Sequence, residues 1–279
     1  MVTTQSDLRQ FWTAFRFQLR SYLRTWRFLG LLIFVTLVSV ALLAIQLSRP
    51  PGYITTTDPT ASIYLSSYLG FLADAVIITA AFLGGDALSI DLAGGPGYLM
   101  LTQPVRRSTL LLGRYVAAGV TGLTIALVYY AFATAAVLHF YSTVPVALAT
   151  SLGCAFLFGL AVLAVAFFFS SFFRNPTVGI VASLLILIIG FPIITSIGDL
   201  TGVEPWFSLD YGSGIITNVL SAHFQHMTSQ PISVGKKGGS IVVYTFSPFL
   251  WEGITIVAGY LAAFLGVSYL IYRFKEVKG

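Results

Sequence analysis

Six long runs of apolar residues constrain this chain more than any other feature of its sequence. Each run is about 20 residues long, which is the length a helix needs to cross a hydrocarbon core ~30 Å thick. The runs do not alternate between apolar and polar residues, so they predict helices rather than the strands of a β-barrel. The expected membrane spans are residues 29–47, 61–85, 115–138, 146–170, 177–198 and 253–272.

Composition excludes a soluble protein. Of the 279 residues, 57% are hydrophobic and 9% are charged, compared with roughly 45–50% and about 25% in soluble domains. So few charges cannot cover a soluble surface, and the apolar surface must therefore face lipid. The single cysteine, Cys154, lies inside an apolar run, which excludes a disulfide framework and a cysteine metal cluster. The predicted fold class is an all-α integral membrane protein.

The basic residues predict the orientation, because cytoplasmic segments of membrane proteins are enriched in Lys and Arg. With the N-terminus inside, the external segments hold only Arg49, Lys236 and Lys237. The cytoplasmic segments hold all the others: Arg9, Arg16, Arg20, Arg24, Arg27, Arg106, Arg107, Arg114, Arg174, Arg273, Lys275 and Lys278. We therefore expect a multi-pass protein of the plasma membrane with both termini in the cytoplasm. The positive charge indicates contact with lipid headgroups and not with nucleic acid.

The residue pattern of positions 1–27 predicts an interfacial amphipathic helix. Residues 28–279 are expected to form a six-helix transmembrane domain. Apolar residues such as Phe11, Phe15 and Leu19 recur every three or four positions, and arginines recur in the same way on the other side. This pattern is typical of an amphipathic helix whose aromatic side lies in lipid and whose arginines face anionic headgroups.

Two connections between the spans are long. The cytoplasmic one, residues 86–108, has two acids, a Gly-Pro hinge, a short apolar stretch and two arginines, which is typical of a short surface helix with a docking face. The other covers residues 199–250 and is expected outside. Gly190, Pro192 and Gly198 at the end of the fifth span predict a break or kink in that helix.

The segment 86–108 resembles the corresponding loop of ABC-2 type permeases, the membrane subunits of one class of ATP-binding-cassette transporters. Members typically have an acidic residue, a Gly-Thr pair, a leucine-rich step, a Pro followed by basic residues, and Leu-Gly-Lys opening the third span. Here those places are taken by Asp91, Gly97, Leu99, Leu101, Pro104, Arg106 and Leu112-Gly113-Arg114. Tyr98 and Arg114 replace the usual Thr and Lys, and Gly94-Gly95 are extra. The layout of six spans after an interfacial helix is also similar.

The resemblance implies a subunit that exports a drug, peptide or lipid-like substrate as a homodimer or heterodimer. A separate ATPase subunit, which binds ATP and Mg²⁺, would dock on the loop between the second and third spans. The coupling residues implied by the resemblance are Asp86, Asp91, Gly97, Tyr98, Leu99, Leu101, Pro104, Arg106 and Arg107. We expect no cofactor and no ATPase activity in this chain, because no G-x-x-x-x-G-K-[ST] motif occurs in it.

Asp74 is the one charged residue within the predicted spans, near the middle of the second. An ionised Asp there costs roughly 2.5–3.5 kcal/mol on insertion scales. It is therefore protonated, bonded to hydroxyls such as those of Ser66, Ser67 or Thr79, or facing a hydrated cavity. Its role is then either to line a translocation path or to form a hydrogen bond between helices.

Two other functions are alternatives. A secondary transporter would be expected to show inverted repeats, which are not visible here. A membrane-embedded protease would need a Ser–His pair within the bilayer or an H-E-x-x-H motif, and neither occurs. His223 and His226 have the spacing of two metal ligands on a helix, with Asp210 or Glu204 as possible third ligands, but we interpret them as part of an ordinary polar loop.

Overall fold

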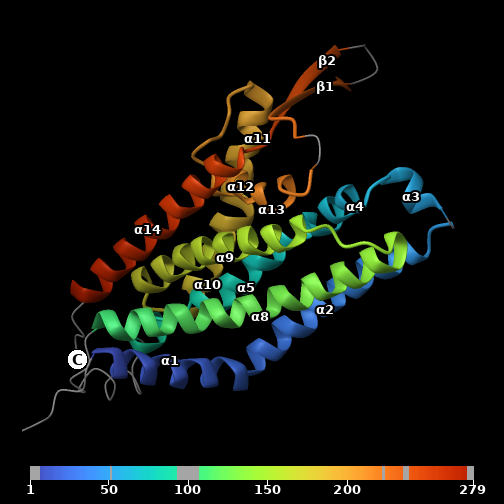
Figure 1. Ribbon diagram of the computed structural model, residues 1–279. Helices are drawn as coiled ribbons and strands as arrows, with labels where there is room; N and C mark the ends of the chain where they lie inside the picture. The colour runs from blue at the N-terminus through green and yellow to red at the C-terminus, as the bar shows by residue number, and fades with distance from the viewer. Residues whose placement is uncertain (1–6, 51, 93–106, 222–223, 235–238, 275–279) are drawn as a thin grey trace, which may run out of the picture.

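The computed structural model describes residues 7–50, 52–92, 107–221, 224–234 and 239–274. In this part of the chain, six helical segments are long and apolar enough to cross a membrane, which confirms a helical membrane protein with six spans. Figure 1 shows them packed in one bundle. They are α2 (Trp26–Leu47), α4–α5 (Ala61–Gly84), α8 (Arg107–Tyr141), α9 (Ala147–Phe172), α10–α11 (Pro176–Thr201) and α14 (Leu250–Phe274).

The third span is longer than predicted. Its apolar run begins at Tyr115, but helix α8 begins at Arg107 and continues for 35 residues. That length corresponds to about 52 Å at 1.5 Å per residue, well beyond the hydrocarbon thickness. A helix satisfies its own backbone hydrogen bonds in water as well as in lipid, so hydropathy marks the edge of the hydrocarbon and not the end of the helix.

The fifth span is distorted where the sequence predicts it. Helix α10 (Pro176–Leu184) passes into a π-helical turn at Leu185–Gly190, and α11 (Phe191–Thr201) follows. Pro192 has no backbone N–H to donate to the preceding turn, and the wider π turn lies directly before it. The helix axis therefore continues through a π turn and does not break.

The N-terminal amphipathic helix α1 (Asp7–Arg24) lies at an angle to α2, because Thr25 between them is extended. Its apolar residues do not all face outward as expected. Helix α1 packs along α8, and the two backbones approach closely at Gly113, where an added Cβ would lie 3.1 Å from the Cβ of Ala14. Phe15 and Tyr22 are half-buried, whereas Trp12 is exposed. One side of α1 is thus covered by protein.

Helix α9 is the centre of the bundle and contacts α5 (Leu72–Gly84), α8, α10 and α14. Small side chains such as Ala161 and Ala164 are fully buried on it, which lets neighbouring helices approach. Tyrosine hydroxyls bond the helices together. The hydroxyl of Tyr115 donates to the Leu160 carbonyl at 2.5 Å, and that of Tyr129 donates to the Tyr68 carbonyl at 2.8 Å. Such interhelical hydrogen bonds are effective in lipid, where no water competes.

The connection after the fifth span contains structure that the sequence analysis did not expect. Two short helices, α12 (Leu209–Ser213) and α13 (Ile215–Asn218), precede an antiparallel hairpin of β1 (Met227–Val234) and β2 (Gly239–Phe246). Strand β2 includes Ile241-Val242-Val243-Tyr244, residues that favour strands. Ser151 of α9 donates to the carbonyl of Ile216 at 2.6 Å and fixes α13 to the bundle.

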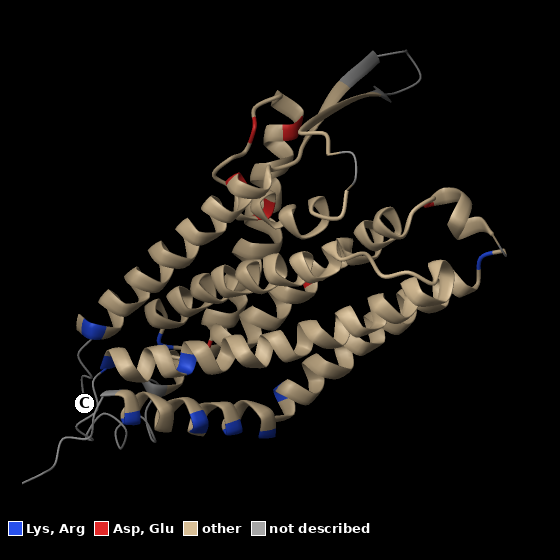
Figure 2. Cartoon of the chain, in the orientation of Figure 1, with Lys and Arg blue, Asp and Glu red and all other residues tan. Residues whose placement is uncertain are grey.

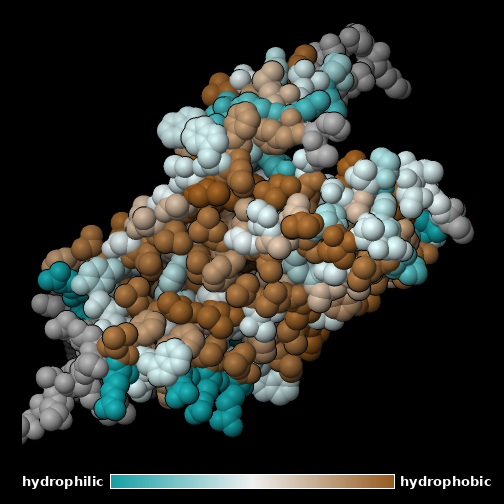
Figure 3. All heavy atoms as spheres, viewed as in Figure 1, coloured by the Kyte–Doolittle hydropathy of each residue, from teal (hydrophilic) through white to brown (hydrophobic). Residues whose placement is uncertain are grey.

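Charge separates the two ends of the bundle (Figure 2). We call the end that carries α1, the start of α8 and the end of α14 the basic end. The opposite end, with α3 (Tyr53–Thr57), α12 and the hairpin, carries most of the acidic residues of the described chain and is called the acidic end. Hydrophobic residues cover the surface between the two ends in the view of Figure 3.

Candidate functional site: the root of the loop between the second and third spans

Most of the predicted coupling residues lie outside the described part of the chain: Gly97, Tyr98, Leu99, Leu101, Pro104 and Arg106. Asp91 lies in the short helix α6 (Ser89–Leu92). Asp86 and Arg107 are described with their side chains. The structure therefore describes where the loop leaves and re-enters the bundle at the basic end. We call residues 83–89, which include the last two residues of the second span, the loop root.

Asp86 is buried at the loop root. It is 2% exposed, and its carboxylate forms an ion pair with Arg27 at the start of α2. The Arg27 side chain is 50% exposed, so this arginine connects the buried acid to the surface. Asp86 thus faces into the bundle, where it fixes the loop root to α2.

The backbone of the loop root is bonded to three further helices. Arg114 of α8 donates to the Ala87 carbonyl at 2.8 Å. The hydroxyl oxygen of Ser170 in α9 accepts from the backbone N–H groups of Leu88 and Ser89 at 2.8 and 3.1 Å. In α1, the hydroxyl of Tyr22 donates to the Leu83 carbonyl at 3.0 Å. Polar groups at the end of α5 are therefore satisfied by α1, α8 and α9.

Two glycines bring the loop root against a fifth helix. A Cβ added to Gly179 in α10 would lie 2.2 Å from the carbonyl oxygen of Gly85. A Cβ added to Gly85 would lie 2.7 Å from the Cα of Ile180. Real Cβ atoms cannot come this close to backbone, so the contact between α5 and α10 requires glycine at both positions.

Arg107 is bonded where the loop re-enters the bundle. Its guanidinium donates to the carbonyls of Tyr272 and Arg273 at 3.2 and 3.1 Å. These carbonyls belong to the last turn of α14, where backbone acceptors have no partner within the helix and where positive charge is favoured. The two ends of the loop are therefore bonded to different parts of the bundle.

Sequence reasoning did not find most of this site. The sequence places Arg27 and Tyr22 in the amphipathic N-terminal pattern, and Arg114 in the Leu112-Gly113-Arg114 stretch of the resemblance. None of these patterns indicates a contact with the loop root. The Gly84-Gly85 pair before Asp86 and the Ser170-Ser171 pair in an aromatic run are the local signals of close contact. Neither pair indicates which residues it contacts, because those residues lie tens of positions away in the sequence.

Asp74, the candidate for a translocation path, is exposed on the surface of the single chain. Among the described residues its carboxyl makes no hydrogen bond or ion pair, and Ser66 bonds the Ile63 carbonyl instead. Asp210 of α12 is close enough for the two charges to interact. Burial raises the pKa of the Asp210 carboxyl, and a hydrogen bond with Thr195 opposes that shift. Two acids that are far apart in the sequence thus lie within range of a through-space charge interaction.

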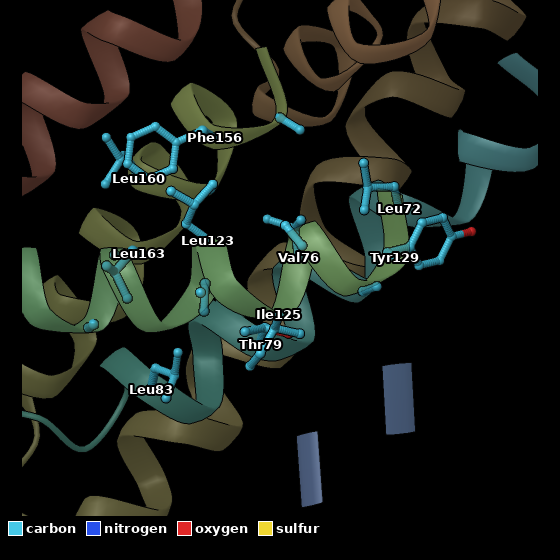
Figure 4. A pocket seen from close by; sticks show the side chains of 18 of the residues that line it. Leu72, Val76, Thr79, Leu83, Leu123, Ile125, Tyr129, Phe156, Leu160 and Leu163 are labelled. Atoms are coloured by element: carbon cyan, nitrogen blue, oxygen red, sulfur yellow. The ribbon is translucent and has the colours of Figure 1, made fainter. Parts of the chain in front are cut away.

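A pocket lies between α5, α8 and α9 (Figure 4), and Asp74 is not among the residues that line it. Its cavity volume is about 40 Å³. Its walls are apolar apart from Thr79 and Tyr129. The Tyr129 hydroxyl already donates to the Tyr68 carbonyl, so the pocket offers little to a polar ligand.

Comparisons with known proteins add no further assignment. No model of a known protein family matches the sequence, and no curated protein is significantly similar to it.

Proposed function

We propose that this chain is the membrane-spanning subunit of an ATP-driven transporter of the ABC-2 permease type. In this proposal the basic end faces the cytoplasm, and a separate ATPase subunit docks on the loop of residues 86–108. ATP and Mg²⁺ belong to that ATPase. The transported substrate is a drug, peptide or lipid-like molecule, and export is its direction.

The bonding of the loop root is the observation that supports coupling. Side chains of α1, α2, α8 and α9 are bonded to residues 83–89, and α10 contacts Gly85. A loop that only joined two spans would not need so many buried polar contacts. A force applied to this loop would reach five helices at once, because each contact is short and mostly buried. The inferred role of Asp86 is therefore to position the loop, and the ATPase-docking contacts fall to the apolar step at Leu99 and Leu101 and to Arg106.

In this proposal a second permease subunit packs next to Asp74. An exposed carboxyl near the middle of a span is unfavourable against lipid and is expected to face protein or water. A translocation path between two subunits would place both protein and water next to this carboxyl. This arrangement places Asp74 and its neighbour Asp210 along the path.

A cation-coupled secondary transporter is the second candidate, and the proximity of Asp74 and Asp210 is the observation that favours it. One carboxylate charge opposes ionisation of the other, which favours binding of a proton at one of the two. The two functions differ in energy source. ATP depletion at a constant proton gradient is expected to stop transport by an ATP-driven permease but not by a cation-coupled secondary transporter.

Co-purification tests the docking loop. A tagged chain is solubilised from its native membranes in mild detergent, and Mg-ATP hydrolysis in the eluate is measured. Leu99→Asp places a charge where an apolar contact is expected. Loss of one buried leucine costs about 1.5–3 kcal/mol, which lowers association by roughly tenfold or more. Reversal of Arg106 to Glu is combined with it in a second variant, and Arg107 is kept because it bonds the end of α14.

Arg49→Glu is the matched control, because it reverses an exposed arginine at the acidic end. It is expected to leave ATPase recovery at the wild-type level. Wild-type recovery in the combined loop variant would show that residues 86–108 are not the docking site. Absence of any ATPase from the wild-type eluate, together with transport that follows the proton gradient, would favour the second candidate.

A further inference from the structure

Three potential metal ligands from separate segments meet at the acidic end of the bundle. Glu204 lies between α11 and α12, His226 lies directly before β1, and Glu252 lies in the first turn of α14. One ligand atom from each lies within 4.8 Å of the other two. We propose that these residues bind a divalent d-block metal ion, for which Zn²⁺ is the probe. This inference does not depend on the proposed transport function.

The histidine is oriented as a metal ligand would be. Its Nδ1 lies 2.9 Å from the carbonyl oxygen of Ser247, which can only accept, so Nδ1 carries the hydrogen. Ligating histidines in metal sites usually donate their other ring N–H in this way. The His226 carbonyl accepts from the Ser247 N–H at 2.8 Å, and the ring stacks on Phe249 with centroids 4.6 Å apart. Backbone and ring together fix the direction of Nε2.

His226 Nε2 points at a carboxylate. It lies 3.6 Å from Oε2 of Glu204, too far for a hydrogen bond. With neutral imidazole, two acceptors face each other here, so a cation or a proton is needed between them. In tetrahedral zinc sites the bonds to N and O are about 2.0–2.2 Å, which separates ligand atoms by roughly 3.3–3.5 Å. The observed separation is close to that value.

Each carboxylate is held by one contact and keeps acceptor capacity for another. The Tyr211 hydroxyl donates to Oε1 of Glu204 at 2.5 Å, on the oxygen that does not face His226. Oε2 of Glu252 accepts from the backbone N–H of Phe249 at 3.0 Å and so caps α14. These contacts fix both glutamates beside the histidine, although neither glutamate has a basic side chain other than His226 within salt-bridge distance among the described residues.

The charge of a divalent cation matches this ligand set, because the two glutamates together contribute two negative charges. The imidazole selects against Mg²⁺ and Ca²⁺, which prefer oxygen ligands, and in favour of ions such as Zn²⁺. Glu204 and His226 side chains are 32% exposed, which leaves room for a water molecule as a fourth ligand.

The bound ion would add a direct link between three segments that lie far apart in sequence. Glu204 follows the fifth span, His226 begins the hairpin, and Glu252 begins the sixth span. A metal between them would fix the hairpin and the segment before α12 to the start of α14. The expected consequence is greater stability of the acidic end when zinc is present.

Metal titration of the purified full-length protein tests the proposal. The chain in detergent is stripped with EDTA, and Zn²⁺ is added against a competing chelator while thermal stability is followed. The expected result is one Zn²⁺ per chain and an apparent Tm that rises with zinc concentration. His226→Ala and Glu204→Gln are each expected to weaken zinc binding at least tenfold. Glu204→Gln keeps the size of the side chain, so this variant is informative even if His226→Ala fails to fold.

His139→Ala is the matched control, since His139 is an exposed histidine at the end of α8 away from the cluster. It is expected to bind zinc as the wild type does. The proposal would be overturned if the wild type did not bind zinc, or if both ligand variants bound it as tightly as the wild type. Glu204 and His226 would then form an ion pair only. A preference for Ca²⁺ over Zn²⁺ that survives His226→Ala would overturn it as well, in favour of an oxygen-only site.

Discussion

The ion pair between Arg27 and Asp86 predicts an asymmetric response to mutation. Its two members differ in burial, because Asp86 is 2% exposed while the Arg27 side chain is 50% exposed. Removing the arginine leaves a buried carboxylate without its counter-charge, which costs about 3–5 kcal/mol. Neutralising the acid leaves an arginine that water can solvate, which costs about 1 kcal/mol or less.

Arg27→Met is the informative change, because it keeps the apolar stem and removes the charge. For a chain of this size, a loss of about 3 kcal/mol lowers Tm by roughly 6–12 °C. Asp86→Asn keeps the shape and an acceptor for Arg27, and is expected to lower Tm by roughly 4 °C at most. The measurement is the fraction of protein that stays monodisperse after heating in detergent.

The double variant completes the test. Arg27→Met with Asp86→Asn removes the stranded charge, so it should be more stable than Arg27→Met alone. Equal decreases in Tm for the two single variants would refute the argument that burial of Asp86 determines the loss of stability. A double variant less stable than either single variant would refute it as well.

Two further outcomes concern the membrane. Cysteines introduced at Thr57 and Ser229 should react with an impermeant maleimide on intact cells, whereas one at Ser108 should not; labelling of the Ser108 position alone would reverse the orientation proposed from the basic residues. Asp74→Asn should impair transport while expression and ATPase recovery stay at wild-type levels, because Asn keeps the hydrogen-bonding shape and loses the charge. Wild-type transport in that variant would remove Asp74 from the path.

Sequence alone predicted the six spans within a few residues, except at the start of the third. The reason is physical: a hydrocarbon core of fixed thickness demands helices of about 20 apolar residues, and each span meets that demand locally. The amphipathic pattern of residues 7–24 and the distortion near Pro192 are local in the same sense. They depend on residues three or four positions apart, or on one missing backbone N–H.

Contacts between distant residues required the tertiary structure. Nothing near Asp86 in the sequence indicates Arg27 as its partner, and the spacing of His223 and His226 pointed to a pair in which His223 lies outside the described residues. The structure instead places His226 beside Glu204 and Glu252. Hydropathy sets the number of the spans and their places in the sequence, because transfer into lipid depends on each residue separately. Which side chains meet is decided by how the helices pack, because charge pairs and metal ligands depend on positions in space.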